Sequence, residues 1–214
     1  MKCSPCKNDQ LNQKRRKAFT LIEMIGVLAV IAILAALLVP KVFSAINDAR
    51  VNGLCVTCET VKTAVADHYG KYGRLDAAFG TNNAALGFNG NNIAPNYDRT
   101  VLMAEGLLDK PFTAKIAGGE PSTNALIQLV QSPGTGNGST GYMLDGTNVV
   151  ANPSFVVEAV IYNVAVADAK DLNDRLDGTA LGVSSLTAAD NRGRVEYDTP
   201  AGGLTTVYIY LTHR

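Results

Sequence analysis

One stretch near the N-terminus limits what this chain can fold into more than any other feature. At residues 14–40 it reads KRRKAFTLIEMIGVLAVIAILAALLVP: four cations, Ala18, then 21 residues whose only ionisable side chain is Glu23, then Pro40. A helix of that length is about 31 Å long, which matches the roughly 30 Å hydrocarbon core of a bilayer. Because the cations precede the apolar run, the positive-inside rule places the N-terminus in the cytoplasm. We therefore expect one membrane span with the remaining chain on the other side.

Glu23 sets this span apart from an ordinary anchor. A carboxylate inside a membrane costs about 2.5 to 3.5 kcal/mol on insertion scales unless it is paired. It needs a partner, and the span offers none. A cut between Ala18 and Phe19 would leave the apolar segment in place and create an α-amine on Phe19, which is charged near neutral pH. Pairing of that amine with Glu23 of a neighbouring helix would satisfy both charges and favours a polymer.

At these residues the chain resembles the type IV pilin-like family, that is, the prepilins and the pseudopilins of type II secretion. The matching residues are KAFTLIE, with Phe19 as first and Glu23 as fifth mature residue, the apolar span, and Pro40 near its end. The resemblance implies cleavage at 18/19 and N-methylation of Phe19 by a membrane-embedded prepilin peptidase. Ala18 stands where the family usually has glycine. Alanine is the next smallest residue, so cleavage is still expected.

The same resemblance implies the partners of the mature chain. They are further copies of itself in a homo-oligomeric filament, other pilins or pseudopilins, and an assembly platform in the inner membrane. Assembly would depend on Phe19 and Glu23. The head would be periplasmic, and after assembly the protein would lie in a periplasmic pseudopilus or an extracellular filament. The alternative is an uncleaved signal anchor carrying a periplasmic binding domain that does not polymerise.

We expect four parts: a cleaved cytoplasmic leader at 1–18, a transmembrane or filament-core helix at 19–40, its amphipathic continuation at 41–73, and a globular head at 74–214. Pro40 removes a backbone hydrogen bond and predicts a bend. Apolar residues recur every three or four positions in the continuation, which predicts one buried stripe. The stripe comprises Val51, Leu54, Cys58, Val61, Val65, Tyr69 and Tyr72, with Gly70 and Gly73 marking its end.

Charge and motif content bound the function of the exported part. The chain has 19 cations and 19 acids, and the leader holds six cations and one acid, so 13 cations and 18 acids remain after cleavage. A mildly acidic domain gives no support to nucleic-acid binding, which uses a clustered basic face. The sequence has no phosphate-binding glycine loop, nucleophile elbow or metal-spaced histidines. We expect a structural protein that is not an enzyme.

The four cysteines form two C-x-x-C pairs, at Cys3 and Cys6 and at Cys55 and Cys58. A four-cysteine zinc site would need both pairs on one side of the membrane. The expected topology separates them and discards the first pair with the leader. For Cys55 and Cys58 the choice lies between two buried thiols and a local disulfide formed in an oxidising compartment.

The head is expected to be an antiparallel sheet packed on the long helix, which makes the fold class α+β and pilin-like. The segment at 155–165, FVVEAVIYNVA, is β-branched and too apolar for an edge, so we expect it at the centre of the sheet. Residues 194–198 and 205–212 flank a Pro-Gly turn and predict a hairpin. Residues 125–130 could form a strand or a short helix.

The segments between these strands are expected to be less regular. Residues 80–96 are rich in Asn and Gly and predict a long surface loop, and residues 98–108 a short helix closed by Gly106. Residues 131–148 predict a loop, a short strand at Tyr142, Met143 and Leu144, and a turn. His68 beside the apolar stripe favours a core role over that of a ligand or base.

A second short helix is expected over 168–177, with acids at every third position. Asp168, Asp171, Asp174 and Asp177 are low-ranking calcium candidates, since hard cations choose clustered carboxylates. The interpretation we favour is a solvated helix face, with no metal and no cofactor, because the loop signature of a dedicated site is missing. The lack of any cysteine after Cys58 favours a pseudopilin over a retractable pilin, whose C-terminal loop is commonly closed by a disulfide.

Overall fold

The structure is a computed structural model, and it describes residues 19–78, 85–116, 124–132, 141–149, 155–181 and 187–214. The predicted leader, and Ala18 with it, lies outside the described residues. The chain divides into two compact units, residues 1–44 and 45–214, and the helix α1 (Leu21–Tyr72) continues from the first into the second. Pro40 lies inside α1, and the bend expected there stays a prediction.

In the second unit, α1 buries one face, as its apolar periodicity predicts. Val51, Leu54, Cys58, Val61 and Val65 are all buried. The expected stripe was wrong at its end, because Ala64 and His68 complete the buried face while Tyr69 and Tyr72 are only half-buried. A face that drifts by a residue is expected because the helical repeat of 3.6 residues is not a whole number.

The end of α1 is set by Gly73. This residue has φ of 70° and donates its N–H to the carbonyl of Tyr69 at 2.7 Å. A left-handed residue after the last helical turn is a common helix stop, and glycine adopts it without steric cost. Gly70 was also expected to mark the end, but it lies inside the helix.

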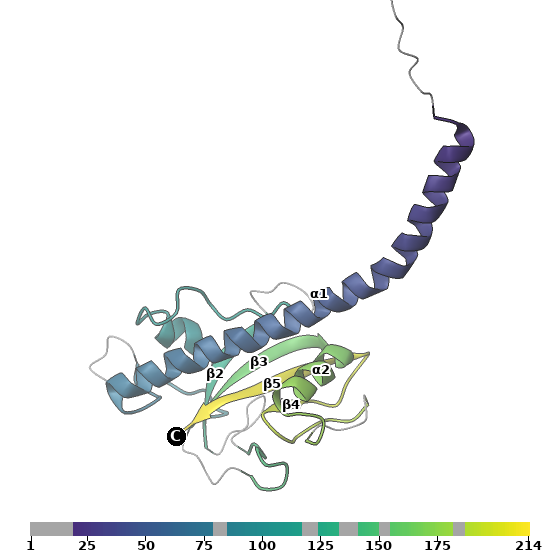
Figure 1. The fold of residues 1–214 in the computed structure, drawn as a ribbon. Coiled ribbons are helices and arrows are strands. Elements are labelled where there is room, and N and C mark those ends of the chain that lie inside the picture. Colours follow the sequence, from purple (N-terminus) through teal and green to yellow (C-terminus); the bar gives the residue numbers. More distant parts are fainter. Residues whose placement is uncertain (1–18, 79–84, 117–123, 133–140, 150–154, 182–186) are drawn as a thin grey trace, which may run out of the picture. The chain divides into compact units, whose positions relative to one another are not determined.

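The described part of the second unit holds one antiparallel sheet with strand order β1-β2-β3-β5-β4 (Figure 1). In chain order the strands are β1 (Ile93–Ala94), β2 (Ala125–Gln131), β3 (Phe155–Ala165), β4 (Val195–Tyr197) and β5 (Leu204–His213). The central position of β3 is confirmed, and so is the pairing of β4 with β5. The α+β, pilin-like layout expected from the sequence is therefore present.

Two short helices accompany the sheet. η1 (Asp98–Leu102) is a single wide turn followed by further turns up to Gly106, which has φ of 74°. α2 (Val166–Leu176) follows β3 directly, in agreement with the helix expected there. Its buried residues Ala169 and Leu172 belong to the core that the sheet shares with α1, so α1 and α2 cover the same face of the sheet (Figure 1).

Two expectations for the connecting segments were wrong in part. The stretch expected as loop over 80–96 contains β1, which pairs with β2 through Ile93 and Val130 and is buried. The short strand expected around Tyr142 is absent, since residues 141–149 form loop and turns. Tyr142 is instead fully buried on the sheet face opposite α1, where it packs with Val156, Val160 and Tyr208 in a second apolar cluster.

Candidate functional site

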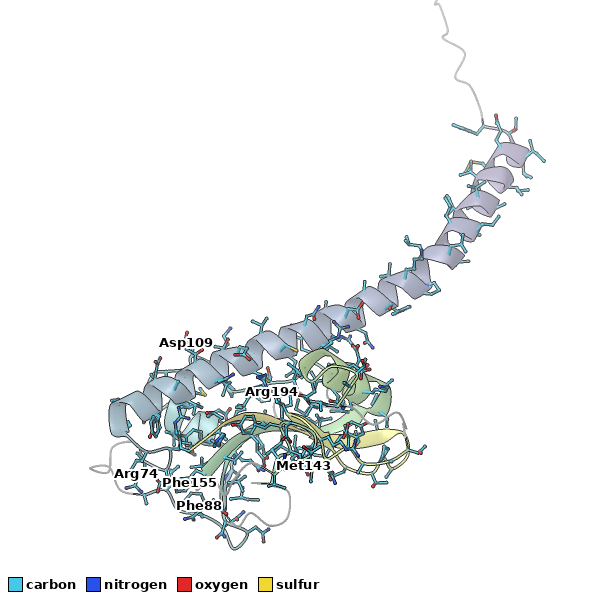
Figure 2. The ribbon with its side chains drawn as sticks, turned by 60° about the horizontal axis from the view of Figure 1, so that its bottom comes forward. Arg74, Phe88, Asp109, Met143, Phe155 and Arg194 are labelled. Atoms are coloured by element: carbon cyan, nitrogen blue, oxygen red, sulfur yellow. The ribbon has the colours of Figure 1, made fainter. Side chains whose placement is uncertain are left out.

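The first unit presents an apolar helix surface that its own fold does not cover. Every described residue from Phe19 to Ser44 is exposed, including Phe19 at 82% and Leu37 at 68%. Side chains project on all sides of this part of α1 (Figure 2). Ordinary soluble monomers rarely expose more than a few hundred Å² of contiguous apolar surface. By length and composition the helix can cross a membrane. This segment is therefore built to be covered by lipid or by other protein.

The start of α1 carries a capping box at the polar end of that surface. Thr20 Oγ1 accepts the backbone N–H of Glu23 at 3.3 Å, and the Glu23 carboxylate accepts the N–H of Thr20 at 2.8 Å. The Thr20 hydroxyl also donates to that carboxylate at 2.8 Å. This reciprocal pattern is the signature of Thr-x-x-Glu at a helix N-terminus. The expectation that the span offers Glu23 no partner was wrong, because Thr20 offers hydrogen bonds, although no positive charge.

Phe19 and Glu23 share one side of the helix with small and branched residues. The hollow along that side is lined by Phe19, Glu23, Gly26, Val27, Val30 and Ile31. A Cβ built on Gly26 would meet nothing within 4 Å, so the described chain does not itself require glycine there. One carboxylate, one N-terminal aromatic residue and an apolar groove thus form a continuous surface.

Comparison with known proteins decides what this segment is. The model of the prokaryotic N-terminal methylation motif matches residues 13–39. The chain carries the class III signal of type IV pilins and pseudopilins. The motif supports a type IV pilin-like protein that prepilin peptidase processes and that assembles with other pilins, and with the apolar helix it indicates membrane anchoring. No curated protein and no solved structure gives a significant match. The head, which lies outside the matched residues, therefore has to be interpreted from its own geometry.

Cys55 and Cys58 lie on the continuation of α1 and are free thiols in the structure. Cys58 is buried, and burial, with the nearby charge of Cys55, raises the pKa of its thiol to about 12. Burial also raises the pKa of the Cys55 thiol, against the Arg175 guanidinium, which lowers it. Thiols with raised pKa values react slowly because the thiolate is the nucleophile. The local disulfide stays a prediction that this arrangement does not favour.

The four calcium candidates on α2 each have a different partner. Asp168 accepts a hydrogen bond from Asn47 at 2.8 Å. Asp171 pairs with Arg175 one turn further along α2, and Asp174 pairs with Lys170 one turn earlier. The Asp177 carboxylate accepts the backbone N–H groups of Arg194 and Val195, both at 2.8 Å. The described residues contain no group of three or more candidate ligands that could hold a metal ion. The carboxylates of these four acids thus do not converge on a common point that could hold a calcium ion.

The core role expected for His68 is confirmed by its full burial, but sequence reasoning missed the buried carboxylates Glu105 and Glu158. The Nδ1 of His68 lies 2.8 Å from Oε1 of Glu105, whose side chain is also buried. Glu158, at the centre of β3, is fully buried and accepts from Gln128 at 2.6 Å and from the Tyr142 hydroxyl at 2.5 Å. The single charged letter in FVVEAVIYNVA was the available signal for Glu158. Nothing local pointed to Glu105, which is 37 residues from its partner.

Proposed function

We propose that this protein is a structural subunit of a type IV pilus-like filament or a type II secretion pseudopilus. Prepilin peptidase cleaves it between Ala18 and Phe19 and methylates the new N-terminus, and Phe19 and Glu23 then mediate assembly through α1. The observation that carries the proposal is Glu23, a carboxylate near the start of an apolar, exposed segment of α1 that bears the methylation motif. No chemistry in the described residues suggests a catalytic role for the head.

The energetics of Glu23 favour pairing between subunits. Hydrogen bonds from Thr20 satisfy the carboxylate geometrically, but its negative charge stays uncompensated in the described chain. The α-amine of Phe19 is the cation that cleavage would supply next to it. Removing one partner of a buried charge pair costs about 3 to 5 kcal/mol because the other charge is left unpaired. Subunit addition is therefore expected to depend strongly on both groups.

The test replaces Glu23 and separates assembly from helix capping. Glu23→Ala should reduce the assembled filament material, recovered from the periplasm and the cell surface together, by at least about 100-fold, since 1.4 kcal/mol corresponds to a factor of ten. The matched control is Thr20→Ala, which removes the cap at a cost of about 1 kcal/mol but keeps the carboxylate, and it should still assemble. Wild-type filament yield from Glu23→Ala, with the head still folded, would refute the proposal and support the anchored, non-polymerising binding domain.

Between the two kinds of filament we favour the pseudopilus, with the head in the periplasm. In the sequence given, no cysteine follows Cys58, whereas retractable pilins commonly close a C-terminal loop with a disulfide. Recovery of assembled protein from the periplasmic fraction would support the pseudopilus. Recovery of long filaments from the cell surface at native expression would instead support an extracellular pilus.

A further inference from the structure

The second unit carries a small hollow beside α1 that the function described so far does not use. It has a volume of about 160 Å³ and lies between α1 and the segment that follows η1, with Arg50, Gly53, Thr57, Thr113 and Lys115 among its lining residues. Arg50 and Lys115 are both exposed, and the described part of the chain gives neither of them a carboxylate partner. The hollow therefore presents two cations without internal compensation.

Gly53 forms part of this hollow in the middle of a long helix. Glycine inside a helix is destabilising relative to alanine, so its presence calls for a reason. The described chain offers none, because a Cβ built on Gly53 would meet nothing within 4 Å. The Thr57 hydroxyl, which also lines the hollow, donates a hydrogen bond to the Gly53 carbonyl oxygen of the same helix at 2.9 Å. The open space above Gly53 suits close approach by something outside the chain.

The opposite flank of α1 has the opposite charge. There α2 is fastened to α1 by Asp168 with Asn47 and by Arg175, which donates to Asp48 at 2.5 Å and to Asn52 at 2.9 Å. Four acids, Asp48, Asp168, Asp171 and Asp174, surround two cations, Lys170 and Arg175, which leaves this flank with a net charge of minus two. The side chains of Asp48 and Asp171 are 55% and 43% exposed.

Helix geometry keeps the two flanks apart. Asp48 and Asn52 are four residues apart and share one side of α1, whereas Arg50, Gly53 and Thr57 share another at spacings of three and four. Two complementary patches on different sides of one molecule cannot satisfy each other within it. They can satisfy each other between copies, and a contact between unlike patches that does not close on itself generates a helical filament.

We propose that the acidic flank around α2 of one subunit docks into the basic hollow around Gly53 of the next. This inference rests on the proposed function and names the contact between heads that complements the contact made by Phe19 and Glu23. Its occupant is a second copy of this chain, because the acidic patch has the charge that Arg50 and Lys115 call for. Surface charge pairs are individually weak and salt-sensitive, so the contact sets orientation while the apolar helix holds the polymer together.

The first test uses full-length variants at Gly53 with Gly70 as the matched control. Gly70 is also helical and exposed, and a Cβ there likewise meets nothing within 4 Å, but it does not line the hollow. Gly53→Ala and Gly70→Ala should each raise the unfolding midpoint of the detergent-solubilised chain by about 2 to 4 °C. Gly53→Leu should reduce the yield of assembled filaments at least tenfold, whereas Gly70→Leu should leave their yield unchanged. Wild-type filament yield from Gly53→Leu would overturn the docking contact.

The second test asks which element enters the hollow. In a Cys55→Ser background, Thr113→Cys in the hollow combined with Ala167→Cys on α2 keeps the charges of both patches and should give a ladder of disulfide-linked multimers when filaments are oxidised. Asp67→Cys, on the exposed side of α1, replaces Ala167→Cys in the control and should give no ladder. Filaments that form normally without the Thr113 to Ala167 ladder would overturn this contact alone. A wild-type chain that yields no filaments at all would overturn the proposed function and this inference together.

Discussion

The stability of the head should fall as the pH rises from mildly acidic to mildly alkaline, because of Glu196 on β4. Burial, reinforced by the charges of Glu158, Asp190 and Asp177, raises the pKa of its carboxyl from 4.5 to about 8. A raised carboxyl pKa means that the folded chain holds a proton which the unfolded chain releases above pH 4.5. This contribution to stability is therefore complete below pH 4.5 and is lost as the pH rises towards 8.

The size of the effect follows from the shift in the pKa of Glu196. Each pKa unit is worth 1.36 kcal/mol, so the full shift corresponds to about 5 kcal/mol, and allowance for partial solvent exposure reduces it to about half. Glu196→Gln mimics the protonated carboxyl and should remove this dependence. In urea unfolding of the full chain in detergent, the difference in unfolding free energy between variant and wild type should grow by about 2 to 3 kcal/mol from pH 4.5 to pH 8.

The matched control for this experiment is Glu59→Gln, which alters an exposed carboxylate whose described ion pair is with Lys62 on the same helix. Its stability should follow that of the wild type across the whole range. If Glu196→Gln and the wild type gave parallel curves of stability against pH, the reasoning about burial and neighbouring acids would be refuted. Groups that do not interact with Glu196 contribute equally to both proteins and cancel in the difference.

Three further predictions concern buried groups and the end of α1. Glu105→Ala should lower the unfolding free energy by about 1 to 3 kcal/mol, because it leaves the buried ring of His68 without its hydrogen-bond partner. Urea unfolding measures this loss, and an unchanged midpoint would contradict the prediction. Cys58 should resist alkylation by iodoacetamide at pH 8 until the head is unfolded, because burial raises the pKa of its thiol and so suppresses the thiolate. Mass spectrometry measures the alkylation, and rapid alkylation of Cys58 in the native protein would contradict the prediction. Gly73→Ala should destabilise the head by about 1 kcal/mol because alanine is strained at φ of 70°. A thermal melt measures this change, and a variant more stable than the wild type would contradict the prediction.

Features with a strong periodic signal were predictable from the sequence. The buried face of α1 follows a 3.6-residue pattern over several turns, and the run of β-branched residues at Phe155–Ala165 identifies the central strand. The hairpin of β4 and β5 follows from the alternation of Thr205, Val207 and Ile209 with Tyr208. In each case many residues repeat the same local information.

Features that depend on distant partners were not predictable in the same way. β1 is two residues long, and its existence rests on pairing of Ile93 with Val130 rather than on its own Asn- and Gly-rich sequence. Tyr142 was predicted to lie in a short strand because it begins an apolar run with Met143 and Leu144, but its burial comes from Val156 and Val160 on β3. Glu105 became a buried partner only because the turns after η1 bring it to His68.

The candidate site divides along the same line. The residues of the methylation motif are contiguous, so Phe19 and Glu23 could be chosen from the sequence alone, although the Thr20 cap went unnoticed. The basic hollow combines α1 with the segment containing Thr113 and Lys115, more than 55 residues away, and no local pattern announces it. The sequence of one chain gives only indirect evidence of a contact between subunits. Here that evidence is a destabilising glycine within a helix, Gly53, and two cations without a carboxylate partner in the described residues, Arg50 and Lys115.

The central claim is that this chain is a processed filament subunit, and its N-terminus tests that claim most directly. Intact-mass and N-terminal peptide analysis should be made on protein from native membranes and on assembled filaments, whether these are recovered from the periplasm or from the cell surface. The account predicts a mature chain that begins with N-methylated Phe19 and is present in both membranes and filaments. An uncleaved chain beginning at Met1, found in membranes alone, would contradict it and leave an anchored head that does not polymerise.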